Sequence, residues 1–214
     1  FVKPFIRIAS GQGFWGDLLT APVDQVRKGP IDYLVMDYLA EVTMSILQKQ
    51  KRKDPQLGYA KDLIPLLEVI LPDCMQRNIK IITNGGGVNP ESCSDAILAL
   101  AQKLGIKGLK VGVVSGDDIL ERVGEFSRQG IELKNMETSE PLDSIQQKVE
   151  CANVYFGASP IAEALRKGAQ IVVTGRTTDT GLTLAPMLYE CDWSEHDWDK
   201  LAASKDARVT FDAL

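Results

Sequence analysis

The sequence predicts an α/β protein with a doubly wound, mainly parallel sheet and helices on both faces, a three-layer sandwich. Short runs rich in Val, Ile and Phe alternate along the chain with stretches of helical periodicity. Strands that alternate with helices pair in parallel through right-handed crossovers. Several runs, such as IKIIT, KVGVV and QIVVT, are apolar almost throughout, which is typical of strands covered on both faces.

The expected elements follow in order from these patterns. The expected strands are short β-branched runs at residues 5–9, 33–36, 79–83, 110–114, 153–156 and 171–174. The expected helices have apolar residues three and four apart and span residues 20–28, 40–51, 60–77, 90–104, 117–128, 160–167 and 179–189. Asn89 and Ser159 each precede a proline, which is a helix-start signal. Residues 130–150 are less regular and are expected to form a surface excursion from a single domain over residues 1–214.

Composition excludes some classes of function. With 44% hydrophobic and 25% charged residues, the 214-residue chain has the balance of a globular protein. Its net charge of -5 disfavours nucleic-acid binding, and the one basic cluster, QKQKRKD at residues 48–54, is typical of a solvated helix end. No apolar run approaches the roughly twenty residues of a membrane helix. The four cysteines form no C-x-x-C pair, which favours the cytoplasm, although a chain beginning at Phe1 is also compatible with an upstream targeting segment.

The segment SGQGFWGD at residues 10–17 carries the G-x-G-x-x-G spacing of dinucleotide-binding proteins, with Asp37 about twenty residues further on. That motif requires a helix that begins near its glycines. Pro22 could not lie inside such a helix, and Phe14 and Trp15 would crowd a tight phosphate turn. We therefore expect residues 11–19 to form a loop, and a nucleotide-dependent oxidoreductase is the weaker alternative.

Polar clusters follow five of the expected strands, and a smaller one, FGAS, follows a sixth. The carboxyl ends of parallel strands meet at one edge of a sheet, where open α/β sheets bind ligands. The five clusters are SGQGFWGD at 10–17, MDYLAE at 36–41, TNGGGVNP at 83–90, VSGDD at 114–118 and TGRTTDTG at 174–181. We expect them to surround a common cleft.

Five ordered motifs together resemble the N-terminal domain of the acyclic terpene utilisation family. They are GQGFWGD, DYLAEVTMSIL, TNGGGVNPESC, VSGDD and VVTGRTTDTGLTLAPMLYE, and the resemblance covers residues 6–201. It implies a part in the breakdown of acyclic terpenoids such as citronellol and geraniol through coenzyme A thioesters, without fixing the chemical step. Family members continue into a further glycine-rich segment containing Glu-Cys, whereas this chain ends KDARVTFDAL. The resemblance therefore implies that the C-terminal part of the usual domain is absent or replaced.

The candidate catalytic residues are carboxylates at the strand ends: Asp17, Asp37, Glu41 and Asp117. Gathered in one cleft, such acids could hold Mg²⁺ or supply one raised pKa for acid-base chemistry. The alternative is that acids such as Asp117 only complement the positive ends of helices. Asp37 and Glu41 lie four residues apart, so both would face the cleft if the turn between them is helical.

The candidate binding residues are glycines, amides, hydroxyls and one cation. Three successive glycines after Asn84 could present backbone amides to a carboxylate, a thioester oxygen or a phosphate, or could simply form a sharp turn. Arg176 suits a carboxylate or phosphate, and pairing with a nearby acid is the alternative. Trp15 is a candidate lid over an apolar substrate, or a core residue. The set is Gly11, Gly13, Trp15, Asn84, Gly85, Gly86, Ser115, Gly116, Arg176, Thr177 and Asp179.

Two functions remain open from the sequence. Cys93 lies early in its helix and is a candidate nucleophile, but the favoured interpretation is a small buried apolar residue. The one histidine, His196, lies far from every motif. The first function is a catabolic enzyme acting on acyclic terpenoid or branched acyl-CoA or carboxylate intermediates by acid-base or lyase-type chemistry, with no redox cofactor. The second is a non-catalytic binding or scaffolding subunit that needs a partner domain or forms a homo-oligomer. Neither requires nucleic acid or a membrane.

Overall fold

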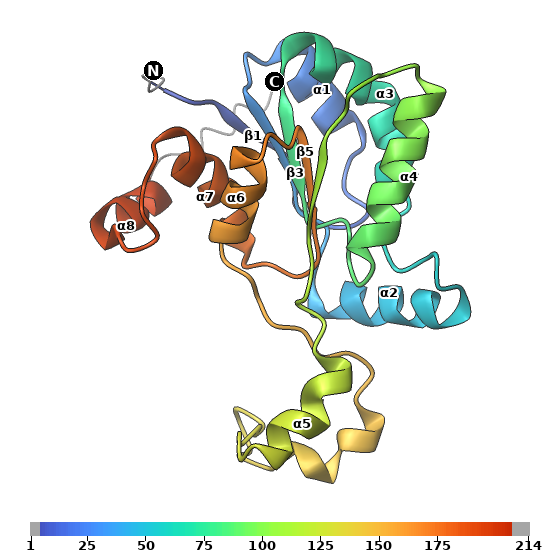
Figure 1. Cartoon of the computed structure of the whole chain (residues 1–214), viewed down its shortest axis with the longest axis vertical. Helices are drawn as coiled ribbons and strands as arrows, with labels where there is room; N and C mark the ends of the chain where they lie inside the picture. Colours follow the sequence, from blue (N-terminus) through green and yellow to red (C-terminus); the bar gives the residue numbers. More distant parts are fainter. Residues whose placement is uncertain (1–4, 207–214) are drawn as a thin grey trace.

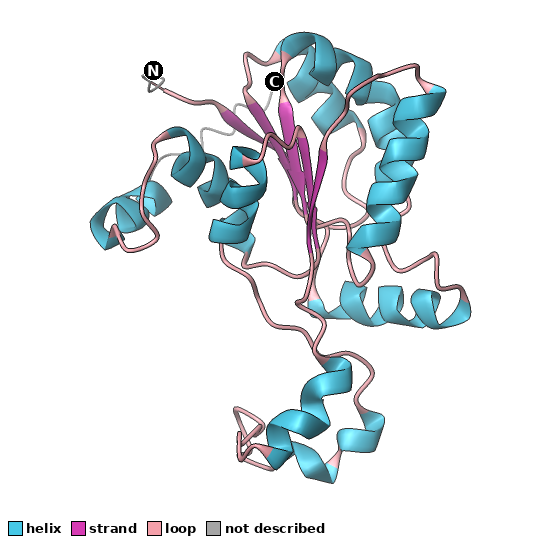
Figure 2. Ribbon diagram, viewed as in Figure 1, coloured by secondary structure: helices cyan, strands magenta, loops and turns pink. Residues whose placement is uncertain are grey.

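The computed structural model describes residues 5–206 and contains a five-stranded sheet in which all strands are parallel (Figure 2). The strand order is β1-β2-β3-β5-β4. The strands are β1 Ile8–Gln12, β2 Tyr33–Met36, β3 Lys80–Thr83, β4 Val111–Val114 and β5 Ile171–Thr174. All residues of β2 and β5 are buried, as their apolar sequences YLVM and IVVT predict. The predicted α/β class is confirmed, whereas the final segment of the tail KDARVTFDAL lies outside the described residues.

The helices form one layer on each face of the sheet (Figure 1). On one face α1 Thr20–Lys28 and α4 Pro90–Lys103 both pack against α3 Leu63–Arg77. On the other face α6 Ser159–Arg166 packs against α7 Asp179–Glu190. Each layer has its own core of buried aliphatic side chains, one around Leu67 and the other around Leu165. The sheet is thus covered on both sides, which is what its apolar strands require.

Two helices lie outside these layers. α2 Glu41–Lys53 lies across the carboxyl ends of the strands, and α8 Trp198–Asp206 follows α7 at the side of the molecule (Figure 1). None of the helices in the described part of the chain is long and apolar enough to span a membrane.

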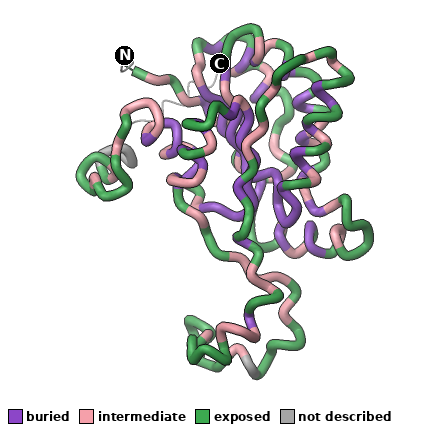
Figure 3. The backbone as a smooth tube through the Cα atoms, viewed as in Figure 1, coloured by how far each residue is buried: buried purple, intermediate pink, exposed green. Residues whose placement is uncertain are grey.

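The segment between β4 and α6 projects away from the sheet and is largely exposed (Figures 1 and 3). It contains α5 Val123–Arg128 and single 3-10 turns at Leu120–Arg122, Leu142–Ser144 and Gln146–Lys148. The predicted helix over residues 117–128 is therefore shorter than expected. The predicted strand at residues 153–156 is wrong, because Asn153 and Phe156 form only isolated bridges to Asp118 and Thr177.

The first strand also differs from its prediction, since β1 begins at Ile8 rather than at residue 5 and continues through Gly11. A Cβ at Gly11 would lie 2.9 Å from Pro22 Cβ and 2.9 Å from Leu34 Cδ1. This glycine therefore lets α1 pack closely on the sheet. The loop expected over residues 11–19 covers only residues 13–19, because Gly11 and Gln12 belong to β1, and the next helix begins at Thr20.

Candidate functional site

The sheet has a switch point between β3 and β5. The chain leaves β3 toward α4 on one face, and it leaves the neighbouring β5 toward α7 on the opposite face. In open parallel sheets ligands bind in the crevice that such diverging connections leave at the carboxyl edge. Asn84 follows β3 and Arg176 follows β5, so these two predicted residues lie at the switch point. The glycine motif after β1 lies at the outer edge of the sheet instead.

Arg176 is the central cation of this site and is only 5% exposed. Its Nη1 donates to the backbone oxygen of Leu39 at 2.5 Å, and its Nη2 donates to the Tyr155 hydroxyl at 3.2 Å. The guanidinium also stacks 4.3 Å from the centre of the Tyr155 ring. Its Nε has no hydrogen-bond partner among the described residues. The guanidinium is therefore held in place by Leu39 and Tyr155, and its Nε is a buried donor that no described residue accepts from.

Tyr155 connects Arg176 to a carboxylate at the surface. Its hydroxyl donates to Glu41 Oε1 at 2.6 Å, and Glu41 and Asp179 each place an oxygen 3.7 Å from Arg176 Nη2. The hydrogen bond from Tyr155 lowers the pKa of Glu41, with Arg176 contributing in the same direction. The same hydrogen bond raises the pKa of Tyr155. The pair therefore holds an ionised carboxylate beside a protonated phenol.

The expected helical pairing of Asp37 with Glu41 is wrong. α2 begins only at Glu41, because Asp37 Oδ1 accepts hydrogen bonds from Leu39 N and from Asn84 Nδ2. Asn84 in turn accepts from Tyr38 N at 2.7 Å, which fixes the turn in a non-helical conformation. Asp37 thus pairs with Asn84, Glu41 pairs with Tyr155, and the pKa of Glu41 is lowered rather than raised.

Asp117 joins the base of the projecting segment to the loop after β5. Its Oδ2 accepts from Arg176 N at 2.7 Å and from Asn153 Nδ2 at 2.9 Å, and the residue is 3% exposed. Burial raises the pKa of Asp117, and these two hydrogen bonds partly oppose the rise. A Cβ at Gly175 would lie 2.1 Å from Asp117 Oδ1, so only glycine fits there. The geometry favours a positioning role for Asp117 beneath Arg176.

Because the pKa of Asp117 is raised, the effect of Asp117→Asn on stability should depend on pH. A carboxyl whose folded-state pKa is raised stabilises the fold most when protonated, and this contribution is lost as pH rises through the folded pKa. We expect the stability of the wild type minus that of Asp117→Asn to fall as pH rises from about 3.5 to about 7. Urea unfolding across this range measures it, with the exposed Asp24→Asn as the control. A difference that stays constant or increases with pH would contradict the assignment.

The glycine-rich turn is packed inside the protein. Gly85, Gly86 and Gly87 are all buried, and a Cβ at Gly86 would lie 2.5 Å from the backbone oxygen of Thr174. Gly85 N donates to Thr83 Oγ1 at 3.0 Å, and Gly87 N donates to Asn84 O at 3.1 Å. These contacts favour the sharp-turn interpretation over amides presented to a ligand.

The other predicted residues divide between structural contacts and the switch point. Asp17 accepts from Gly13 N at 3.0 Å and from Leu18 N at 2.7 Å, so it shapes its own loop. Trp15 packs on the core and donates to Asp62 Oδ1 at 2.7 Å. Thr177 is buried beside Arg176, and its Oγ1 has no partner among the described residues.

The remaining candidates are exposed or do not meet the requirements of their proposed chemistry. Ser115 and Gly116 are exposed at the end of β4. Burial raises the pKa of the Cys93 thiol to about 12, which disfavours a thiolate nucleophile. Within residues 5–206, no three His, Cys, Asp or Glu side chains are grouped to hold a metal ion.

The chain matches the model of a known protein family, described as acyclic terpene utilisation family protein AtuA, over residues 6–207. The chain belongs to this family. No curated protein and no solved structure matches it. Within this acyclic terpene utilisation protein, the matched range includes Arg176, Glu41 and the projecting segment with Tyr155.

Sequence reasoning missed Tyr155, because the run NVYF was interpreted as a buried strand. In the structure Tyr155 is 47% exposed and reaches a glutamate 114 residues earlier in the chain. The neighbouring FGAS cluster, which follows the misassigned strand, was the only sequence signal near it.

Proposed function

We propose that this acyclic terpene utilisation protein is a catabolic enzyme that acts on an acyclic terpenoid or branched acyl intermediate. The acyl group would be presented as a carboxylate or a coenzyme A thioester, and the chemistry would be of acid-base or lyase type. Family membership supports the terpenoid-related role. The observation that carries the chemistry is the chain of contacts from buried Arg176 through Tyr155 to Glu41 at the switch point.

Each of these three residues has a role that its surroundings favour. Removing a proton next to a carbonyl group places negative charge on the carbonyl oxygen, which a preorganised guanidinium such as that of Arg176 stabilises. Glu41, which is ionised, is the candidate proton acceptor, and Tyr155, which is protonated, is the candidate donor. The pKa shifts fix these protonation states and make each group a weaker base or acid than it would be alone. Loss or addition of water or another group then completes a lyase or hydratase reaction.

A second candidate function, a non-catalytic binding subunit, is favoured by a different observation. Asp17, Asp37 and Asp117 all accept hydrogen bonds within the protein, so these acids are engaged rather than directed at a ligand. An open groove also lies along the outer edge of β4, the strand next to β5. Such features are typical of a protein that acts through a partner.

One experiment separates the two functions. The protein is incubated in D₂O with the acids derived from geraniol and citronellol, as free carboxylates and as coenzyme A thioesters, and followed by NMR. Deuterium incorporation next to the carbonyl group, or a new product, would support the enzyme. Compounds that raise the melting temperature without exchange or turnover would favour the binding subunit. Absence of exchange, turnover and any thermal shift would contradict both.

A further inference from the structure

Among the strands of residues 5–206, none pairs with the outer edge of β4. Lys110 O accepts from Gln170 N at 2.9 Å, and Val114 O accepts from Gly175 N at 3.2 Å, so these alternate residues face β5. Because backbone groups alternate in direction along a strand, those of Val111 and Val113 point to the open side. Natural proteins usually protect such an edge with charge, proline or a bulge.

The four residues of β4 themselves have none of these protections, and the nearest charge is that of Lys110 directly before the strand. Its sequence, VGVV, contains no charge and no proline, and its four residues pair with β5 in unbroken register. The opposite edge strand, β1, differs because its register with β2 shifts between Ser10 and Gln12. The regular edge of β4 is therefore suited to pair with another strand.

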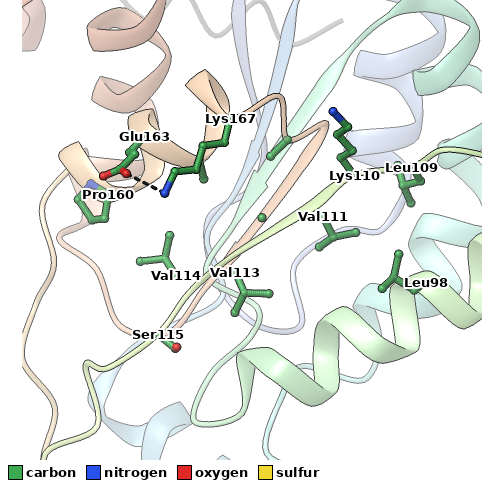
Figure 4. Close-up of a pocket in the computed structure, with 13 residues that line it drawn as sticks. Leu98, Leu109, Lys110, Val111, Val113, Val114, Ser115, Pro160, Glu163 and Lys167 are labelled. Carbon is green, nitrogen blue, oxygen red and sulfur yellow. Dashed lines mark ion pairs between the residues drawn. The ribbon is translucent and has the colours of Figure 1, made fainter.

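A groove of about 740 Å³, lined by aliphatic side chains and by charged ones such as Lys110, accompanies this edge (Figure 4). Leu98 of α4 lies on the side of Val111 and Val113. On the other side are Pro160 and Glu163 of α6 and Lys167 just after it. Leu98 is 43% exposed and Val113 is 38% exposed. An added strand would cover both side chains while satisfying the open backbone groups.

The charges beside the groove identify the partner. Acids lie near its carboxyl end, since Glu91 and Asp95 share a face of α4 with Leu98. Asp118, which follows β4, also borders the cations Lys51, Arg52 and Arg122. Its amino end is basic, since Lys110 precedes β4 and lines the groove, whereas the nearby Lys167 is paired with Glu163. A two-fold axis perpendicular to the sheet would place the acidic end of one copy against the basic end of the other. The surface is thus complementary to itself, as a symmetric dimer interface must be.

We propose that β4 pairs with β4 of a second copy of this chain in antiparallel orientation, which joins two five-stranded sheets into one. With Val113 facing its counterpart at the axis, Val111 lies opposite Ser115 of the second copy. Lys110 then lies opposite Gly116, two residues from Asp118. This inference does not depend on the proposed function, because the edge is at β4 and the candidate site is at β3 and β5.

Light scattering coupled to size exclusion tests the dimer. The wild type is expected at twice its monomer mass of 23.5 kDa. Val113→Lys, which places a charge at the axis, is expected to halve the measured mass while leaving the far-ultraviolet circular dichroism spectrum unchanged. Gln129→Lys, on the projecting segment, controls for an added charge and is expected to remain dimeric.

Charge reversal tests the partner and its orientation. Lys110→Glu or Asp118→Lys alone should increase the dissociation constant about tenfold or more, and the double variant Lys110→Glu/Asp118→Lys should restore the dimer. The residues are at or near the surface, so these variants are expected to fold. A wild type that stays monomeric over a concentration range of about a hundredfold would overturn the proposal. A dimer that survives both Val113→Lys and Lys110→Glu would also overturn it.

Discussion

Gly86→Ala is expected to lower the free energy of unfolding by about 3 kcal/mol, the upper part of the range for overpacking a dense core. The new Cβ would lie 2.5 Å from Thr174 O, 2.8 Å from Val173 Cγ1 and 2.8 Å from Pro90 Cβ. The first contact is with backbone, so the ends of β3 and β5 would have to separate. Chemical unfolding followed by circular dichroism measures the loss.

Gly13→Ala is the matched control, because a Cβ there has Asp17 Oδ2 at 3.9 Å as its nearest neighbour. This change is expected to alter the free energy of unfolding by no more than about 0.5 kcal/mol. Equal effects at the two glycines would contradict the packing argument. A small effect at Gly86 alone would mean that the turn has room beside it, and the ligand-binding interpretation of Gly85 and Gly86 would then regain support.

The sequence predicts the sheet well because its strands are apolar on both faces, a pattern that local residues alone create. It fails at residues 153–156 for an equally physical reason. The run NVYF has the composition of a strand, but its neighbours diverge, so Asn153 bridges antiparallel to Asp118 while Phe156 bridges parallel to Thr177. A strand forms only where a neighbouring strand can pair with it, and no local sequence pattern encodes whether residues 153–156 have such a neighbour.

The position of the candidate site is predictable because local patterns predict the strands and hence the edge of the sheet. The contacts within the site are not predictable in this way. Parallel strands necessarily bring Asp37, Asn84 and Arg176 to one edge. The pairing of Asp37 with Asn84 instead of Glu41 depends on a side chain 47 residues away, and Glu41 meets Tyr155 across 114 residues. Whether three successive glycines bind a ligand or pack against β5 depends on the neighbouring strand, which the order β3-β5 fixes only in three dimensions.

Arg176→Met is expected to destabilise the protein by about 2 to 4 kcal/mol, because it leaves the backbone oxygen of Leu39 without its donor in a buried environment. Arg176→Lys keeps the charge but cannot reach Leu39 O and Tyr155 with two separate donors, so we expect a smaller loss. Thermal and urea unfolding measure both. Arg166→Met, which removes an exposed arginine that donates to Leu188 O at 3.3 Å, is the matched control and should cost less.

Activity separates a catalytic Arg176 from a merely structural one. If the proposed acid-base chemistry is correct, Arg176→Lys should slow deuterium exchange or turnover by about a hundredfold or more under conditions where it remains folded, because preorganised stabilisation of the developing charge is lost. Tyr155→Phe and Glu41→Gln should also slow the reaction at least tenfold, with stability changes within about 0.5 kcal/mol, since both side chains are substantially exposed. Glu68→Gln, which removes an exposed ion-paired carboxylate on α3, should leave the rate unchanged. Full activity in Tyr155→Phe and Glu41→Gln would show that the contacts of Arg176 only support the fold, and the binding-subunit function would then be the better account of this edge of the sheet.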